Sequence, residues 1–89
     1  MKEKNMNLKY STSDLATATF LFTIGHKLLT TSILNAKKLI FHFEHTANIE
    51  EDAARFLHGA EAPAKKLFEN YRTLRAITFE KINMNGRKT

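Results

Sequence analysis

The sequence predicts a single α+β domain with the element order helix, β-hairpin, helix, helix, in which the hairpin packs on the helices and can extend across a dimer. Three observations support this fold class. An apolar run follows a cluster of capping residues near the start, an alternating apolar segment lies in the middle, and two stripes of helical period follow it. The 89 residues are too few for two ordinary domains.

The first element is expected to be a helix over residues 13–24. Thr12 or Ser13 is expected to accept hydrogen bonds from the first free amides, Asp14 suits the positive end of the helix, and Gly25 supplies a natural stop. Apolar residues surround this segment almost completely, which indicates burial on more than one side and leaves a surplus face for a second copy of the chain. Its β-branched and aromatic residues also fit a strand, so that alternative stays open.

A β-hairpin is expected next. Its first strand is the β-branched segment 27–34, and its second is the alternating segment 38–45. Asn35, which tolerates a positive φ, opens the tight connection between them. The apolar residues on one side of the second strand are Leu39, Phe41 and Phe43. A two-stranded hairpin is marginal by itself, so it must lie on helices or pair with a second copy to form four strands.

Two helices are expected to close the domain. The first begins with a capping box between Asn48 and Glu51 and ends at Gly59. The second begins at Pro63 and continues to about Lys81. Its apolar stripe consists of Leu67, Phe68, Tyr71, Leu74, Thr78 and Ile82. The expected organisation is a flexible basic N-terminus over residues 1–9, the single α+β domain over residues 10–82, and a disordered basic tail over residues 83–89.

Several of these motifs occur together in an order that resembles a domain-of-unknown-function family of small bacterial and phage proteins. The pattern is Y-x-T-x-D-L-A from Tyr10, a turn glycine at Gly25, the apolar strand of the hairpin, and a closing basic helix. It departs from the family at His26, where an aromatic residue is expected. The resemblance covers about residues 8–80 and implies a phage or mobile-element setting, with no assigned activity and no catalytic residue.

The residue types and spacings do not point to catalysis. His42 and His45 are three residues apart on the expected strand, so their side chains point to opposite faces and do not share a metal easily. N-capping explains Asp14, and the acidic run from Glu50 suits the positive end of a helix. The chain has no cysteine, no glycine-rich phosphate loop and no nucleophile elbow. We therefore expect no enzyme activity, cofactor, metal or small-molecule substrate.

Hydropathy and the start of the chain bear on localisation. No apolar run reaches the roughly 18 residues of a membrane span. The first residues are polar and lack the apolar core of a signal peptide. We expect a cytoplasmic protein with no membrane partner.

Charge is the observation that favours a binding function. Fourteen basic and nine acidic residues give a formal net charge of +5. Residues 11–62 carry a net charge of −2, whereas residues 63–89 carry +5. Such segregation favours an anionic partner. Basic residues on the solvent-exposed face of an ordinary helix would give the same net charge.

The last helix is the expected binding surface. Lys65 and Arg72 are seven residues apart and lie almost on one line along the helix, from which long basic side chains reach successive phosphates. We expect a small nonenzymatic protein that contacts nucleic acid mainly through phosphates. The residues expected to make these contacts are Lys65, Lys66, Arg72, Arg75, Lys37 and Lys38.

Homo-oligomerisation without a nucleic-acid role is the alternative function. It would use the surplus face of the first helix and the unsupported hairpin, because buried aromatic residues dominate interface energies. The expected interface residues are Phe20, Phe22, Phe41 and Phe43. Two other interpretations stay open: the same residues fill a monomeric core, or the basic helix lies on a membrane surface.

Overall fold

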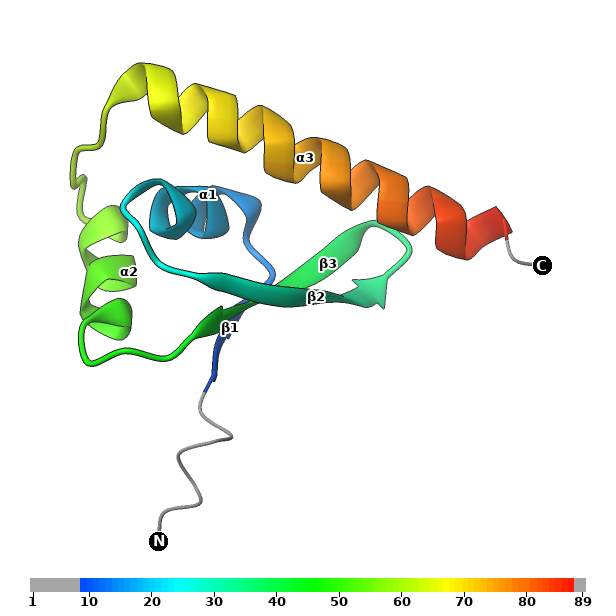
Figure 1. Cartoon of the computed structure of the whole chain (residues 1–89), viewed down its shortest axis with the longest axis horizontal. Coiled ribbons are helices and arrows are strands. Elements are labelled where there is room, and N and C mark those ends of the chain that lie inside the picture. The colour runs from blue at the N-terminus through cyan, green and yellow to red at the C-terminus, as the bar shows by residue number, and fades with distance from the viewer. Residues whose placement is uncertain (1–8, 88–89) are drawn as a thin grey trace, which may run out of the picture.

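The computed structural model of the chain describes residues 9–87. Its elements, in chain order, are β1 (Lys9–Thr12), α1 (Leu15–Thr23), β2 (Leu28–Asn35), β3 (Lys38–Glu44), α2 (Ile49–Leu57) and α3 (Ala64–Arg87). The predicted α+β class is confirmed, as is the packing of the hairpin on helices (Figure 1). Residues 1–8 of the expected flexible N-terminus and residues 88–89 of the expected tail lie outside the described residues.

The sheet contains one strand that the sequence did not predict. Its three antiparallel strands lie in the order β1-β3-β2, so β3 is central. In the register of β1, Tyr10 lies opposite Phe43 and Thr12 lies opposite Phe41. β1 was not predicted because its four residues are too few to show the alternation of apolar and polar residues that marks a strand. This strand forms because β3, already paired with β2 on one side, offers a free edge on the other.

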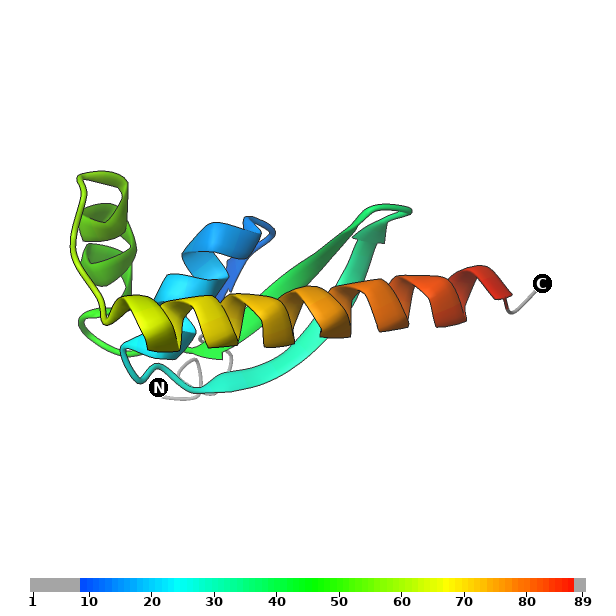
Figure 2. The same cartoon turned by 90° about the horizontal axis from the view of Figure 1, so that it is seen from above.

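The helices cover one face of this sheet. α1 and α3 lie over that face, and α2 packs against α1 at one end (Figure 1). Figure 2 shows α3 running along most of the length of the molecule. The core between these layers consists of Ala18, Phe20, Leu21, Leu39, Phe41, Phe43, Ile49, Ala53 and Leu74.

The surplus apolar face of α1 is covered within one chain. Residues 17–21 of this helix are all buried, because the sheet, α2 and α3 surround it. Phe56 of α2, for example, stacks on Phe20 with ring centroids 5.0 Å apart. The expectation that a second copy covers this helix is therefore wrong.

The phenylalanines expected at an oligomer interface are part of the same core. Phe20, Phe41 and Phe43 are at most 1% exposed. Phe22 is partly buried against the core. Since side chains enclosed by their own chain cannot contact another copy of the same fold, the prediction is wrong for Phe20, Phe41 and Phe43.

The caps differ from those predicted. Asp14 is the N-cap of α1, and its Oδ2 accepts a hydrogen bond from the backbone N–H of Thr17 at 3.0 Å. Thr12 acts one step earlier, with its Oγ1 accepting from the N–H of Asp14 at 3.1 Å. At α2, the side chain of Asn48 makes no capping hydrogen bond. Its backbone is already in the helical region, at φ −102° and ψ −6°, whereas a capping residue is typically extended.

The ends of the other helices also correct the prediction. Gly25 adopts φ +108° directly after α1, as expected of a helix stop. The last helix does not end at about Lys81 but continues to Arg87. Residues 83–87 are therefore helical and not a disordered tail. No proline interrupts them, and Ile82, partly buried against the core, ties this end of the helix to the domain.

Candidate nucleic-acid interface

Helix α3 has an inner face that holds it to the domain. Leu74 is 1% exposed and belongs to the core. One turn earlier, the Asn70 side-chain amide donates to Oγ1 of Thr23 on α1 at 3.0 Å. Ile77 and Ile82 are partly buried against the same core. These contacts fix the rotation of α3 about its axis and thereby decide which residues face outward.

The outer face of α3 carries aromatic and basic side chains in one row. Phe68, Arg72, Arg75 and Phe79 follow one another at spacings of four, three and four residues, which places them on one side of a helix. Lys65 precedes Phe68 by three residues and extends the row. We refer to these five residues as the basic-aromatic stripe. At 1.5 Å per residue it is about 21 Å long.

The aromatic members of the stripe are largely uncovered. Phe68 is 61% exposed and Phe79 is 70% exposed, although most large aromatic side chains are buried. The guanidinium carbon of Arg72 lies 5.7 Å from the centre of the Phe68 ring, within cation–π distance. Arg75, Phe79 and Arg72 also line a shallow hollow of about 340 Å³ on the helix surface.

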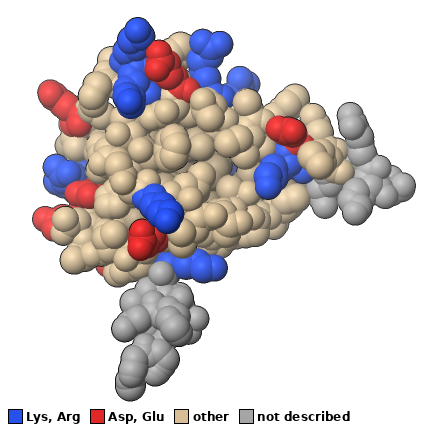
Figure 3. Space-filling model, in the orientation of Figure 1, with Lys and Arg blue, Asp and Glu red and all other residues tan. Residues whose placement is uncertain are grey.

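The basic members of the stripe lie on an open part of the surface. Lys65, Arg72 and Arg75 are exposed, and among the described residues none of them forms an ion pair. Basic side chains gather along the edge of the molecule formed by α3 (Figure 3). The helix as a whole carries six basic and two acidic residues. This arrangement leaves the cations free to meet anionic groups from outside.

The structure brings only half of the predicted contact residues together. Lys65, Arg72 and Arg75 share the stripe. Lys66 is exposed, but one residue turns a helix by about 100°, so it does not lie on the same line. The remaining two, at positions 37–38, lie at the tip of the β2–β3 hairpin. This tip is at the end of the molecule away from the start of α3 (Figure 1).

The sequence analysis missed the aromatic half of the stripe. The sequence predicts Phe68 in the apolar stripe that faces the core, and Phe79 is not among the predicted contact residues. The signal that separates them is the spacing, because both lie in one row with Arg72 and Arg75 and neither lies in the row of Leu74. That row could have been found before the structure was known.

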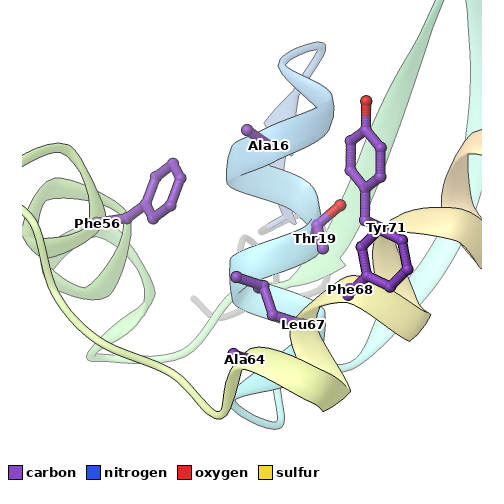
Figure 4. A pocket seen from close by; sticks show the side chains of 7 residues that line it. All are labelled: Ala16, Thr19, Phe56, Ala64, Leu67, Phe68 and Tyr71. Carbon is purple, nitrogen blue, oxygen red and sulfur yellow. The ribbon is translucent and has the colours of Figure 1, made fainter.

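A second surface feature adjoins the stripe at Phe68. It is an apolar groove of about 250 Å³ between α1, α2 and the first turns of α3. In Figure 4, Phe56 stands on one side of this groove, and Phe68 and Tyr71 stand on the other. Its volume is below the range of about 300–1,000 Å³ typical of sites for drug-sized ligands.

Two histidines make contacts that tie elements together. On the face of the sheet away from the helices, His42 joins all three strands: its Nδ1 is 2.7 Å from Ser11 Oγ on β1, and its Nε2 is 2.6 Å from Ser32 Oγ on β2. Both hydroxyls are exposed. The cluster therefore joins the three strands on the outer face of the sheet.

The other histidine cluster ties the start of β2 to α2. His26 Nε2 donates to Oδ2 of Asp52 at 2.7 Å, and Arg55 donates to Oδ1 of the same carboxylate at 2.9 Å. The hydrogen bond from His26, followed by that from Arg55, holds the pKa of Asp52 below its ordinary value. Within the part of the chain described, no three histidine, aspartate or glutamate side chains are grouped so as to hold a metal ion.

Comparison with known proteins gives no further guidance. No family model, curated protein or solved structure matches this chain. Over residues 9–87, no helix is both long enough and apolar enough to cross a membrane. The candidate site therefore stands on its own geometry, and its strongest feature is the basic-aromatic stripe of α3.

Proposed function

We propose that this chain is a nonenzymatic binding protein that contacts nucleic acid through the basic-aromatic stripe of α3. One observation carries the proposal: exposed aromatic rings and exposed cations lie in one row on α3. Both rings, Phe68 and Phe79, are more than half exposed. Cations alone would fit any anionic surface. Rings placed among cations fit a polymer that presents phosphates and flat bases together.

The chemistry favours single strands over duplex. A base stacks on an aromatic ring only when its face is accessible, and in a duplex both faces are covered by neighbouring base pairs. The stripe is straight, about 21 Å long and open along its length. Lys65, Arg72 and Arg75 would contact the backbone while Phe68 and Phe79 stack on bases, so binding should show little sequence preference.

The direct test is fluorescence anisotropy with labelled single-stranded DNA, single-stranded RNA and duplex DNA between about 50 and 200 mM salt. We expect the single strands to bind more tightly than the duplex. Three phosphate contacts on a single strand give a slope of log K against log salt of roughly −2. Absence of binding at about 50 mM salt would end the proposal.

Variants of the stripe locate the site. Phe68→Ala and Phe79→Ala should each weaken binding by about 1–3 kcal/mol, because each removes one stacked base. Arg72→Gln and Arg75→Gln should each reduce the salt slope by roughly 0.7. Lys66→Gln is the matched control, since it removes the same charge from the same helix outside the row. Equal effects of Lys66→Gln and Arg72→Gln would show that net charge, and not the stripe, drives binding.

The mobile-element setting implied by the resemblance in the sequence is part of this proposal. Its test is the genomic neighbourhood of the coding sequence. Adjacent phage replication, packaging or defence genes would support it, and a neighbourhood of housekeeping genes would count against it.

Self-association stays a proposal as well, but it needs a surface other than the four phenylalanines first expected. Phe20, Phe41 and Phe43 are enclosed in the core. The exposed large apolar residues Leu29, Ile33 and Leu34 instead lie on β2.

A further inference from the structure

The two edges of the sheet differ in how well they are protected. β1 is four residues long and begins with Lys9, and short charged edges resist pairing with other chains. β2 is eight residues long, from Leu28 to Asn35, and has no charged residue. Its unpaired backbone groups are a template for another strand.

The apolar layer of the domain is left open along this edge. Ile33 pairs with Leu39, so it lies on the face of the sheet that the helices cover. Leu39 is 1% exposed, whereas Ile33 is 40% exposed. The covered face of the sheet is therefore closed at β3, whereas at β2 it is partly covered at Leu28 and exposed at Ile33. A residue on the covered face of a sheet is normally buried. The exposure of Ile33 therefore indicates that a second molecule covers the apolar layer at this edge.

A groove runs alongside the same edge. It has a volume of about 560 Å³ and lies between the first half of β2 and the C-terminal half of α3. Leu28, Leu29, Ile77 and Met84 contribute its apolar lining, and Glu80 and Lys81 of α3 place one charge of each sign on its helix side. Leu29 and Met84 are 44% and 57% exposed. In Figure 1, no helix or other strand lies in front of β2, and much of the corresponding surface in Figure 3 is uncharged.

From these observations we infer that a second copy of this chain pairs with β2, edge to edge and antiparallel, to form a six-stranded sheet. The axis of such a dimer is perpendicular to the sheet, so both copies present the same edge and both sets of helices lie on the same side. Because the two strands run antiparallel, the groove beside residues 28–31 of each copy lies next to the second half of β2 of the other copy, where Ile33 and Leu34 are exposed.

We assign this edge to a second copy of the chain because β2 is compatible with pairing to an identical strand. An isologous antiparallel contact pairs each residue of β2 with another residue of the same strand in the second copy, so a charge on β2 would appear on both sides of the contact. β2 has none. Register shifts at Leu29 and Leu34 interrupt the ladder near each end of the strand and leave Thr30–Ile33 regular. Residues that face each other across two paired strands point to the same face of the sheet. The two-fold axis must therefore pass through a residue that is paired with the same residue of the other copy. In the middle of the regular segment, this residue is Thr31 or Ser32.

This contact is independent of nucleic-acid binding. The stripe residues and the residues of the β2 edge have no member in common. A chain that dimerises without binding nucleic acid, or binds nucleic acid as a monomer, would therefore separate the two proposals.

Sedimentation velocity over a range of concentrations tests the dimer. The wild type should change from the monomer mass of 10.2 kDa to twice that value as concentration rises. Ile33→Lys and Leu29→Lys should each shift the midpoint by about tenfold or more to higher concentration, because each places a charge in a contact that is otherwise uncharged along β2 and removes it from water. Leu57→Lys, on α2 and 75% exposed in the wild type, is the control and should leave the midpoint unchanged. Far-UV circular dichroism establishes that each variant is folded.

Cross-linking tests the register. The chain has no cysteine, so a single introduced thiol has only its counterpart to react with. Either Thr31→Cys or Ser32→Cys should form a disulfide-linked dimer on mild oxidation, whereas Leu57→Cys should not. A single 10.2 kDa species at every concentration would overturn the inference. So would a dimer that forms equally well in the β2 lysine variants.

Discussion

Leu74→Ala is the most informative single substitution for the docking of α3. Leu74 is 1% exposed, and no other residue of this helix whose exposure is described is fully buried. Truncating a buried leucine to alanine costs about 2–5 kcal/mol, from lost burial and the cavity left behind. A domain of 89 residues has a total stability of roughly 4–13 kcal/mol. The substitution should therefore remove a large share of the stability without changing helix propensity unfavourably.

Thermal and urea unfolding followed by far-UV circular dichroism measures this effect. For a domain of this size each kcal/mol lowers Tm by about 4–8 °C, so a loss of about 3 kcal/mol corresponds to roughly 12–24 °C. Phe79→Ala removes a larger side chain from the same helix, but one that is 70% exposed, and should change stability by no more than about 0.5 kcal/mol. A cost below about 1 kcal/mol for Leu74→Ala, or equal costs for the two variants, would refute the described docking of α3.

Three further predictions concern the ends of α1 and the contact between β2 and α2. Asp14→Ala should cost about 0.5–2 kcal/mol in urea unfolding, because the N–H of Thr17 loses its acceptor, and Asp14→Asn should restore most of it. Gly25→Ala should cost about 1–3 kcal/mol, since φ is +108° there; an unchanged Tm would contradict this backbone conformation. The pKa of Asp52 is lowered, mainly by its hydrogen bond from His26. The ionised Asp52 carboxylate therefore contributes its full stabilisation above the unfolded-state pKa of about 4, and this contribution is lost as the pH falls through the folded-state pKa. The difference in unfolding free energy between the wild type and Asp52→Asn should therefore shrink below about pH 4, and a difference that persists to pH 2 would show that this carboxylate is not the titrating group.

The basic-aromatic stripe shows how far pattern analysis reaches along a helix. The period of 3.6 correctly predicted a helix from Pro63 onward, and it placed Lys65 and Arg72 on one line. It also assigned Phe68 to the core, because an apolar side chain beside a core stripe is ordinarily buried. Whether such a flanking position is covered depends on the width of the surface it packs on. Here that surface is narrow, and Leu74 is the only fully enclosed residue among those of α3 whose exposure is described.

The interface prediction failed for a related reason. Counting apolar residues on α1 correctly showed that this helix is buried on several sides. It could not show which partner does the burying, because a face covered by the same chain and a face covered by another chain have the same composition. Phe20 meets Phe56 of α2 within the chain, and the uncovered apolar residues lie on β2 instead, including Leu29 and Ile33.

The sequence by itself determined the helices and the hairpin, because periodicity, glycine stops and the alternation around Phe41 are local properties of the chain. It also determined where the charge lies. Only the tertiary structure decided that residues Lys9–Thr12 form a third strand, that β2 is left at an edge, and that Phe68 and Phe79 face solvent beside Arg72. Pairing and exposure depend on which segments meet in space, and a residue's own neighbours in sequence do not fix that.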